Sequence, residues 1–520
     1  MLDDGLGPAL LAAAKRNTDR LALWAGDEML SYRALFERAG AVAALLTSRG
    51  IVPGEQVAIL SFRSSAAYVG VVAALLAGCT YVPLNTRFPP ERNAAILRGS
   101  GARALVLDNR AAEELASLLG ELDPSVMAVT PDPGPGPKTS FELHRPHSAE
   151  LTLEDIKPVS VNPEQPCYLL FTSGTTGAPK GVPITHANLG SYLPAIHKLV
   201  PIGPDDRVLQ CVDLTFDLSV HDMFLTWLNG ATLYSAPENS SIFAPRLIAQ
   251  HELTACLLVP STAARAMQEG LLGAGKMPSL RYSLFAGEAL PVSIVEAWRA
   301  SAPNSAVFNL YGPTEGTIHT SWYKIDPKRE LKMPVVPIGW PVGEQRMELF
   351  DAGKPVPAGE TGEIYLTGPQ MTPGYWRAPA LDAEKFIMID GTRWYRTGDL
   401  GRHVDEFGVI FGGRADRQVK IRGYRVELQE IEGALRKASG SEQVAVIAWP
   451  LTAEGIAEGC VAFVVGAQRD MAEIRHLCRE ALPVYMVPSE VFAVEELPLN
   501  ANGKTDYKAL YRHQALPAGS

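Results

Sequence analysis

A loop between residues 169 and 181 carries the residue types best suited to hold a phosphate. The segment reads LLFTSGTTGAPKG, an apolar run that passes into Ser, Gly and Thr and ends near Lys180. Glycines let backbone N–H groups approach an anion closely, and hydroxyls add donors. The residues with these properties are Ser173, Gly174, Thr175, Thr176 and Gly177. Lys180 adds a positive charge for a departing pyrophosphate. Composition alone leaves a flexible surface loop as an equally good interpretation.

This loop is not a P-loop. That motif reads GxxxxGK[ST], with its glycines five positions apart, whereas Gly174 and Gly177 are three apart. A GKT triplet at 503–505 fails as well, because Pro498 occupies the position of the first glycine.

Strand-like apolar runs alternate with helix-like segments through most of the chain. We expect buried strands over Gln56–Phe62, Ala104–Leu107 and Tyr168–Phe171, and helices over Ala66–Leu76 and Pro291–Ala300. Alternation of this kind predicts an α/β fold with largely parallel sheets.

The last fifth of the chain reads as a separate domain. A turn is expected at Gly412–Gly413, followed by a helix with Leu428, Ile431 and Leu435 on one face. Strand runs follow at 444–449 and 460–465, and then a helix near 471–482. These elements suffice for a small α+β domain of roughly 100 residues. The predicted domains are therefore 1–413 and 414–520.

Composition and charge exclude several classes of function. The chain has 520 residues and a net charge of −10, which argues against a general nucleic-acid binder because such a protein needs a cationic surface. The most apolar stretch, 66–79, is shorter than the ~20 residues that cross a bilayer. The N-terminus lacks the basic region of a secretory signal. The six cysteines form no CxxC pair, so we expect free thiols in a cytoplasmic protein.

A series of motifs resembles the adenylate-forming superfamily, which includes acyl-CoA synthetases, luciferases and the adenylation domains of nonribosomal peptide synthetases. The phosphate loop FTSGTTGAPKGV is one of them. The others, in order, are LSYRALFERA (30–39), LLAGCTYVPLN (75–85), NLYGPTEGTI (309–318), GEIYLTGPQMTPGYW (362–376), YRTGDL (395–400), GRADRQVKIRGYRVEL (413–428) and LPLNANGKTD (497–506). The resemblance implies a large N-terminal domain of two α/β subdomains plus a distorted β-barrel, capped by a small mobile α+β domain.

The resemblance also implies ATP and Mg²⁺ and assigns a role to individual residues. Lys504 resembles the catalytic lysine that bridges the substrate carboxylate and the α-phosphate, with Thr314 also at that phosphate. Asp399 resembles the acceptor for both ribose hydroxyls, which suits a carboxylate with two oxygens. Glu315 resembles the Mg²⁺ ligand, since a hard cation prefers carboxylate oxygen. The other implied positions are Arg414 at the ribose, Tyr311, Gly287 and Glu288 at the adenine, and Asp416 at the hinge between the domains.

The segment LTFDLSVHDMF (214–224) resembles the motif in which amino-acid adenylation domains carry an aspartate. Asp217 matches it, and its carboxylate would pair with the substrate ammonium. The alternative is a helix-capping aspartate. By the same matching, the side-chain pocket consists of Leu218, His221, Leu257, Leu284, Ala286, Leu310, Ile318 and His319. This pocket is mostly aliphatic, so a buried charged side chain would lack a partner. We expect a small or medium neutral amino acid, with proline or alanine favoured; a β-amino acid stays open.

The acceptor of the activated acid is expected to be a separate molecule. The sequence continues only briefly after Lys504 and shows no carrier segment. A discrete carrier protein with a phosphopantetheine arm is favoured, with no nucleic-acid or membrane partner. Two alternatives remain: an acyl- or aryl-CoA ligase, against which Asp217 argues, and a catalytically silent nucleotide sensor, against which Lys504, Glu315 and Asp399 argue.

Overall fold

The computed structural model describes residues 2–114, 126–133, 137, 139, 141–146, 151–174, 179–237, 240–452, 456–499 and 505–514. The chain forms two compact units. The first contains Met1–Thr86, Ile96–Phe171 and Gly181–Ala415, and the second contains Arg87–Ala95, Thr172–Lys180 and Asp416–Ser520.

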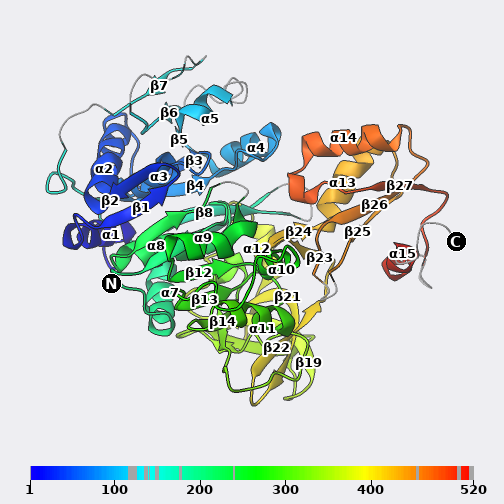
Figure 1. The fold of residues 1–520 in the computed structure, drawn as a ribbon. Helices are drawn as coiled ribbons and strands as arrows, with labels where there is room; N and C mark the ends of the chain where they lie inside the picture. The colour runs from blue at the N-terminus through cyan, green and yellow to red at the C-terminus, as the bar shows by residue number, and fades with distance from the viewer. Residues whose placement is uncertain are drawn as a thin grey trace. The chain divides into compact units, whose positions relative to one another are not determined.

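The first unit is built on two largely parallel sheets and one antiparallel sheet (Figure 1). The nine-stranded sheet has the order β16 (Trp340–Pro341), β15 (Ser321–Lys324), β14 (Ala306–Tyr311), β13 (Tyr282–Phe285), β12 (Ala255–Leu258), β10 (Arg207–Gln210), β11 (Thr232–Ser235), β1 (Leu21–Ala25), β2 (Glu28–Ser31). The seven-stranded sheet has the order β7 (Leu143–His144), β6 (Met127–Val129), β5 (Ala104–Leu107), β3 (Gln56–Leu60), β4 (Thr80–Pro83), β8 (Pro166–Thr172), β9 (Lys180–Thr185).

The third sheet is antiparallel. It corresponds to the distorted β-barrel that the resemblance implied. Its order is β18 (Lys354–Pro355), β17 (Arg346–Asp351), β19 (Thr361–Thr367), β21 (Thr392–Val404), β20 (Phe386–Ile389), with β22 (Gly408–Arg414) paired to β21. The expected turn at Gly412–Gly413 is wrong, because both glycines lie inside β22. Arg414 ends that strand opposite Asp399, so it belongs to the first unit and not to the second.

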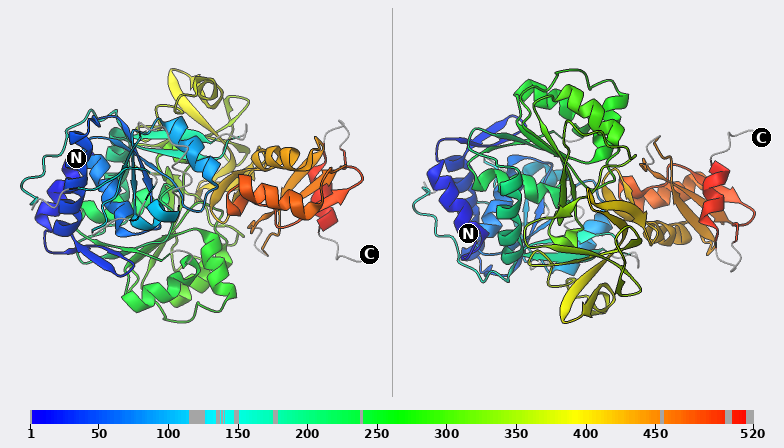
Figure 2. Two further views of the ribbon diagram at one scale, coloured as in Figure 1. Left: turned by 90° about the horizontal axis from the view of Figure 1, so that it is seen from above. Right: turned by 90° about the horizontal axis from the view of Figure 1, so that it is seen from below.

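The helices that join the strands supply the layers. They are α1 (Leu6–Arg16), α2 (Tyr32–Ser48), α3 (Ser65–Leu76), α4 (Pro90–Ser100), α5 (Asn109–Glu114), α7 (His186–Leu199), α8 (Leu218–Leu228), α9 (Ala244–His251), α10 (Pro260–Gln268), α11 (Val292–Ser301) and α12 (Pro379–Lys385). Helices α9 to α11 gather on one side of the first unit (green in Figure 2). The predicted α/β fold is confirmed.

Helix α3 lies at the centre of the core. All of its residues are buried, and it packs against β3, β4 and β5 of one sheet and β1 of the other. A helix that is apolar all round is expected in such a place. Helix α1 packs on both α3 and α8, and the close approach of α1 to α3 requires a glycine. A Cβ at Gly7 would lie 2.3 Å from the carbonyl oxygen of Leu75.

The second unit has its own core. A β23–β24 hairpin (Gln418–Ile421, Tyr424–Glu427) leads into α13 (Leu428–Ser439). A three-stranded sheet follows, β25 (Val444–Ala448), β26 (Cys460–Val465) and β27 (Val491–Val494). Helices α13 and α14 (Met471–Ala481) pack on each other, and α15 (Tyr507–Gln514) packs on β25. The predicted small α+β domain therefore forms.

The structure also bears on the state of the cysteines and on the length and apolarity of the helices. The six cysteines are all buried and free, as expected. Within the described ranges, every helix falls short of the length and apolarity that a membrane span requires.

Gly7→Ala is expected to destabilise the first unit, because its methyl group would overlap the backbone of α3. Overpacking of a core contact costs about 1–3 kcal/mol. Thermal or urea unfolding measures the effect. Gly203→Ala is the control, since a Cβ there meets nothing within 4 Å, and equal stability of the two variants would contradict the predicted clash.

Candidate active site

Strand register brings three strand ends to one edge of the nine-stranded sheet. Strands β12, β13 and β14 run parallel, with Leu258 opposite Phe285 and Phe285 opposite Asn309. The segments that leave this edge begin at Val259, Ala286 and Gly312. Ligands of open parallel sheets bind outside the carboxyl ends of the strands. The candidate site is therefore at this edge.

A hydrogen-bonded cluster on Asp399 lies next to the end of β14. The Tyr311 hydroxyl donates to Asp399 Oδ2 at 2.6 Å, and the Arg414 guanidinium donates to Asp399 Oδ1. Arg414 also donates to the Thr397 carbonyl at 3.1 Å. Burial and then the neighbouring Asp399 raise the pKa of Tyr311 well above its ordinary value. The structure thus brings together three residues that the resemblance assigned to the nucleoside.

Gly287 and Glu288, the predicted adenine positions, lie two and three residues after the end of β13. Gly287 has a φ of +86°, which a residue with a Cβ rarely adopts. The Glu288 carboxylate accepts a hydrogen bond of 2.7 Å from the Ser261 backbone N–H, in the first turn of α10. This bond ties the end of β13 to the helix after β12.

Glu315 is fully buried in the short helix η2 (Thr314–Gly316). The Tyr375 hydroxyl donates to its Oε1 at 2.6 Å and lies 3.3 Å from the Tyr395 hydroxyl. A carboxylate accepts up to about four bonds, so Tyr375 orients this group without exhausting it. In the described part of the chain, His, Cys, Asp and Glu side chains form no metal-binding group of three or more. Mg²⁺ in nucleotide enzymes commonly takes one or two carboxylates plus substrate phosphates, which a single oriented glutamate fits.

The phosphate loop is described at its two ends. Ser173 and Gly174 follow β8, and Lys180 begins β9. Thr175, Thr176, Gly177 and the catalytic candidate Lys504 lie outside the described residues. Thr314 opens η2, one residue before Glu315. Asp416 is the first residue of the chain's final segment in the second unit, and its carboxylate accepts a bond of 3.1 Å from the Gln418 N–H.

Asp217 precedes α8, and its carboxylate does not cap that helix. The side chain is nevertheless buried, with only 7% of the residue exposed. The capping interpretation therefore loses its support. Its negative charge contributes to raising the pKa of three buried tyrosines, Tyr81, Tyr168 and Tyr192, after desolvation. A buried carboxylate in such surroundings favours a cationic partner.

Three leucines of the predicted pocket, Leu257, Leu284 and Leu310, share one face of the sheet. Leu257 pairs with Leu284, and Leu284 pairs with Phe308. Since side chains alternate along a strand, Leu310 lies on the same face as these two leucines. Helix α8, which carries Leu218 and His221, packs on neighbouring strands β10 and β11. The remaining pocket residues, Ala286, Ile318 and His319, are all buried and follow β13 or η2.

Ile318 and His319 are positioned by a turn with a strained backbone. Thr317 and Ile318 have φ values of +60° and +72°, which are unusual for β-branched residues. The Thr317 hydroxyl donates to the Gln370 carbonyl, and Gln370 Nε2 donates to the His319 carbonyl at 2.9 Å. Backbone strain of this kind is concentrated at functional sites.

Two histidines of the predicted pocket meet at one hydroxyl. Tyr192 Oη lies 2.7 Å from His221 Nδ1 and 2.8 Å from His319 Nδ1. The hydroxyl has one proton, so it donates to one ring and accepts an N–H from the other. Desolvation lowers the pKa of His221 to about 3 and the pKa of His319 far below its ordinary value. Both imidazoles are therefore neutral at pH 7.

Sequence reasoning missed Tyr192, Tyr375 and Gln370. Each fixes a predicted residue through a contact between distant positions. Tyr192 sits in α7, whose start is set by a capping box between Thr185 and Asn188. A tyrosine inside an apolar helix face reads as core, so no local signal marks it.

Stability is expected to fall as pH falls below about 6.5, the unfolded-state pKa of histidine. Between that value and the folded-state pKa of about 3 for His221, the unfolded chain binds protons that the folded chain does not. The loss is on the order of 1 kcal/mol per pH unit for each buried histidine. Urea unfolding at pH 7.5 and 5.5 measures it. His221→Gln should lose less stability over this range; an equal loss would contradict the neutral-imidazole assignment.

Known proteins resemble the chain over nearly its full length. The model of the AMP-binding enzyme family matches residues 10–376, and that of the AMP-binding enzyme C-terminal domain matches 430–504. The Vibrio cholerae adenylation domain AlmE, solved in complex with glycyl-adenosine-5'-phosphate, is 34% identical with a TM-score of 0.89, and the likeness covers 98% of this chain and 97% of that one.

Two curated relatives are much longer than this chain. Tyrocidine synthase 2 of Brevibacillus parabrevis is 32% identical over 504 residues, which are 96% of this chain and 13% of that protein. Phosphinothricin tripeptide synthetase PhsB of Streptomyces viridochromogenes is 35% identical over 520 residues, 97% of this chain and 42% of that protein. Together with the hydrogen-bonded cluster on Asp399, these matches identify the chain as a member of the AMP-binding enzyme family, an adenylate-forming enzyme.

Proposed function

We propose that this enzyme activates a small neutral amino acid with ATP as aminoacyl-AMP and passes the aminoacyl group to the phosphopantetheine thiol of a carrier protein. The observation that carries the proposal is Asp217. It is buried, does not cap its helix, and acts electrostatically on the buried tyrosines Tyr81, Tyr168 and Tyr192, so its charge suits the ammonium group of an amino acid.

In the first reaction, a substrate carboxylate oxygen attacks the α-phosphorus of ATP. A new C–O–P bond forms, the bond to the β-phosphate breaks, and pyrophosphate leaves. Both partners are anions, so the enzyme has to supply positive charge and alignment. We assign Lys504 to the carboxylate and α-phosphate, and Lys180 to the leaving pyrophosphate. Mg²⁺ held by Glu315 would neutralise phosphate charge.

The nucleoside is assigned to the cluster at the sheet edge. Asp399 accepts hydrogen bonds from Tyr311 and Arg414, and its two oxygens suit a ribose cis-diol. The Arg414 guanidinium holds this carboxylate in a fixed orientation for the diol. Thr314, next to Glu315, is placed at the α-phosphate.

The pocket supports a short side chain. Leucines occupy the sheet face, and the Tyr192-bridged histidines are neutral and fixed. A charged side chain would be buried here without a partner. Proline and alanine are favoured from the pocket residues, and glycine joins them because AlmE was solved with a glycyl adenylate. In the second reaction the thiol sulfur attacks the aminoacyl carbonyl carbon, a thioester C–S bond forms, the bond to AMP breaks and AMP leaves. This step is proposed because one relative of the chain is a tripeptide synthetase, which has to join activated amino acids.

The competing functions predict other substrates. An acyl- or aryl-CoA ligase would activate an acid without an amino group and use coenzyme A. A β-amino-acid enzyme would keep the need for Asp217 but prefer the longer backbone. Pyrophosphate exchange with each class of acid separates these functions from the proposed one.

Asp217→Asn is expected to lower amino-acid-dependent ATP–pyrophosphate exchange by about two to three orders of magnitude. Loss of one partner of a buried charge pair costs about 2–5 kcal/mol. The isosteric amide preserves shape, so the change reports charge. Propionate, which is alanine without its amino group, is the control substrate; its weak exchange should not drop in the variant. Undiminished exchange with alanine, proline and glycine would exclude the ammonium-pairing role.

Lys504→Ala is expected to lower adenylation by about 10²- to 10³-fold, the usual effect of removing one transition-state donor. ATP affinity, measured by calorimetry, should change little, because the lysine acts on the reacting groups. Lys508→Ala removes the same charge from an exposed position close by in the sequence and should leave the rate unchanged. Equal losses in the two variants would show that only net charge matters.

A further inference from the structure

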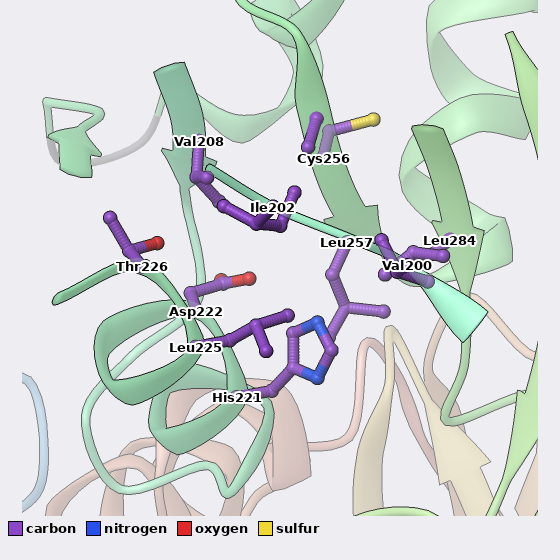
Figure 3. A pocket seen from close by; sticks show the side chains of 11 residues that line it. Val200, Ile202, Val208, His221, Asp222, Leu225, Thr226, Cys256, Leu257 and Leu284 are labelled. Atoms are coloured by element: carbon purple, nitrogen blue, oxygen red, sulfur yellow. The ribbon is translucent and has the colours of Figure 1, made fainter. Parts of the chain in front are cut away.

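A small cavity lies under α8, against strands β10, β12 and β13. It offers about 10 Å³ of room for the centre of a water molecule, which is close to the space for one water. Most of its wall is apolar, including Leu257 and Leu284. The polar groups at this cavity come mainly from α8, as Figure 3 shows.

The cavity contains a buried acid that has no partner in the described part of the chain. Asp222 is 1% exposed, and both of its carboxyl oxygens lack a hydrogen bond. Thr226, one helical turn later, is buried too, and its hydroxyl also lacks one. Desolvation raises the pKa of Asp222 well above its ordinary value, which favours the neutral carboxylic acid. Unsatisfied buried polar groups are costly and call for an explanation.

His221 is common to the cavity and to the residues assigned to the amino-acid pocket. It lines the cavity, and it is also a residue of the proposed acid pocket, as are Leu257 and Leu284. Along α8, Asp217 and His221 are four residues apart and so lie on one helical face, while Asp222 lies about 100° further round. The rise from Asp217 to Asp222 is about 7.5 Å. An amino acid held by Asp217 would therefore direct its side chain toward His221 before it reached Asp222.

The imidazole of His221 is held in place. Its Nδ1 lies 2.7 Å from the Tyr192 hydroxyl, and the same hydroxyl lies 2.8 Å from His319 Nδ1. If the His221 ring rotated away from Tyr192, buried polar atoms would lose their hydrogen bonds. This loss opposes the rotation.

We propose that His221 is a specificity-determining partition, which closes the amino-acid pocket off from the Asp222–Thr226 cavity and so denies this acid to amino acids with a cationic side chain. The inference rests on the proposed function for the place of the substrate. Without the imidazole, the amino-acid pocket and the Asp222–Thr226 cavity form one space. The Asp222 carboxyl group then lies at the end of the enlarged pocket. An amino acid with a terminal ammonium, such as 2,4-diaminobutyrate, ornithine or lysine, can then pair with the Asp222 carboxyl group. This group loses its proton when the ammonium binds.

The test compares His221→Ala with the wild type in ATP–pyrophosphate exchange. The substrates are ornithine and norleucine, which have the same length and differ by an ammonium in place of a methyl group. We expect kcat/KM for ornithine to rise at least tenfold in the variant and to exceed that for norleucine. The double variant H221A/D222N, with an isosteric amide, should lose the gain with ornithine and keep any gain with norleucine.

Other results would overturn the proposal. Equal gains with ornithine and norleucine, or a gain with ornithine that survives Asp222→Asn, would show that Asp222 is not the recognising group. No gain with either substrate, in a variant that unfolds at the wild-type temperature and binds ATP, would show that His221 separates nothing. If H221A does not fold, His221→Asn keeps a polar atom toward Tyr192, shortens the side chain, and is judged by the same criteria. Failure of the wild type to activate any small amino acid would instead contradict the proposed function.

Discussion

The parallel pairing of β12, β13 and β14 is the constraint on which the binding groups depend. Parallel strands place their carboxyl ends at one edge, and the pairing of Leu257 with Leu284 and of Leu284 with Phe308 fixes which side chains share a face. The predicted adenine positions, η2 and the leucines of the predicted pocket are therefore placed near one edge of the sheet although they are distant in sequence. A shift of one residue in this register would turn the leucines to the opposite face.

Charge is used sparingly around the proposed substrate pocket. Asp217 lies next to α8, whereas burial keeps the two histidines neutral and a shared bond to Tyr192 holds them in place. Burial also raises the pKa of Asp222 well above its ordinary value. Selectivity among amino acids then follows from which polar groups a side chain can reach, since an unpaired buried charge is strongly unfavourable.

The hydrogen-bonded cluster on Asp399 lies at the boundary between the two units. Asp399 and Arg414 face each other across the β21–β22 ladder, so the pairing that orients the carboxylate proposed for the ribose also ends the first unit. The next residues are Ala415 and Asp416, at which the chain passes into the second unit. The position of Asp416 is therefore set by the last pair of an antiparallel sheet, and this position suits a hinge.

The sequence by itself determined the family, the α/β class and much of the secondary structure. Ala104–Leu107 and Cys460–Val465 were predicted with the observed bounds, because an apolar run between turn residues is a local signal. Motif matching likewise named Asp399, Tyr311 and Arg414, which the structure brings together.

Only the tertiary structure decided how these residues are held. Gly412 and Gly413 read as a turn, but pairing with β21 extends them into a strand. The bond from Tyr375 to Glu315, the hydroxyl shared by His221 and His319, and the cavity on Asp222 each join positions far apart in the chain. Local patterns report propensity and periodicity, whereas hydrogen bonds and cavities depend on which distant elements pack together, and that information is absent from residue spacing.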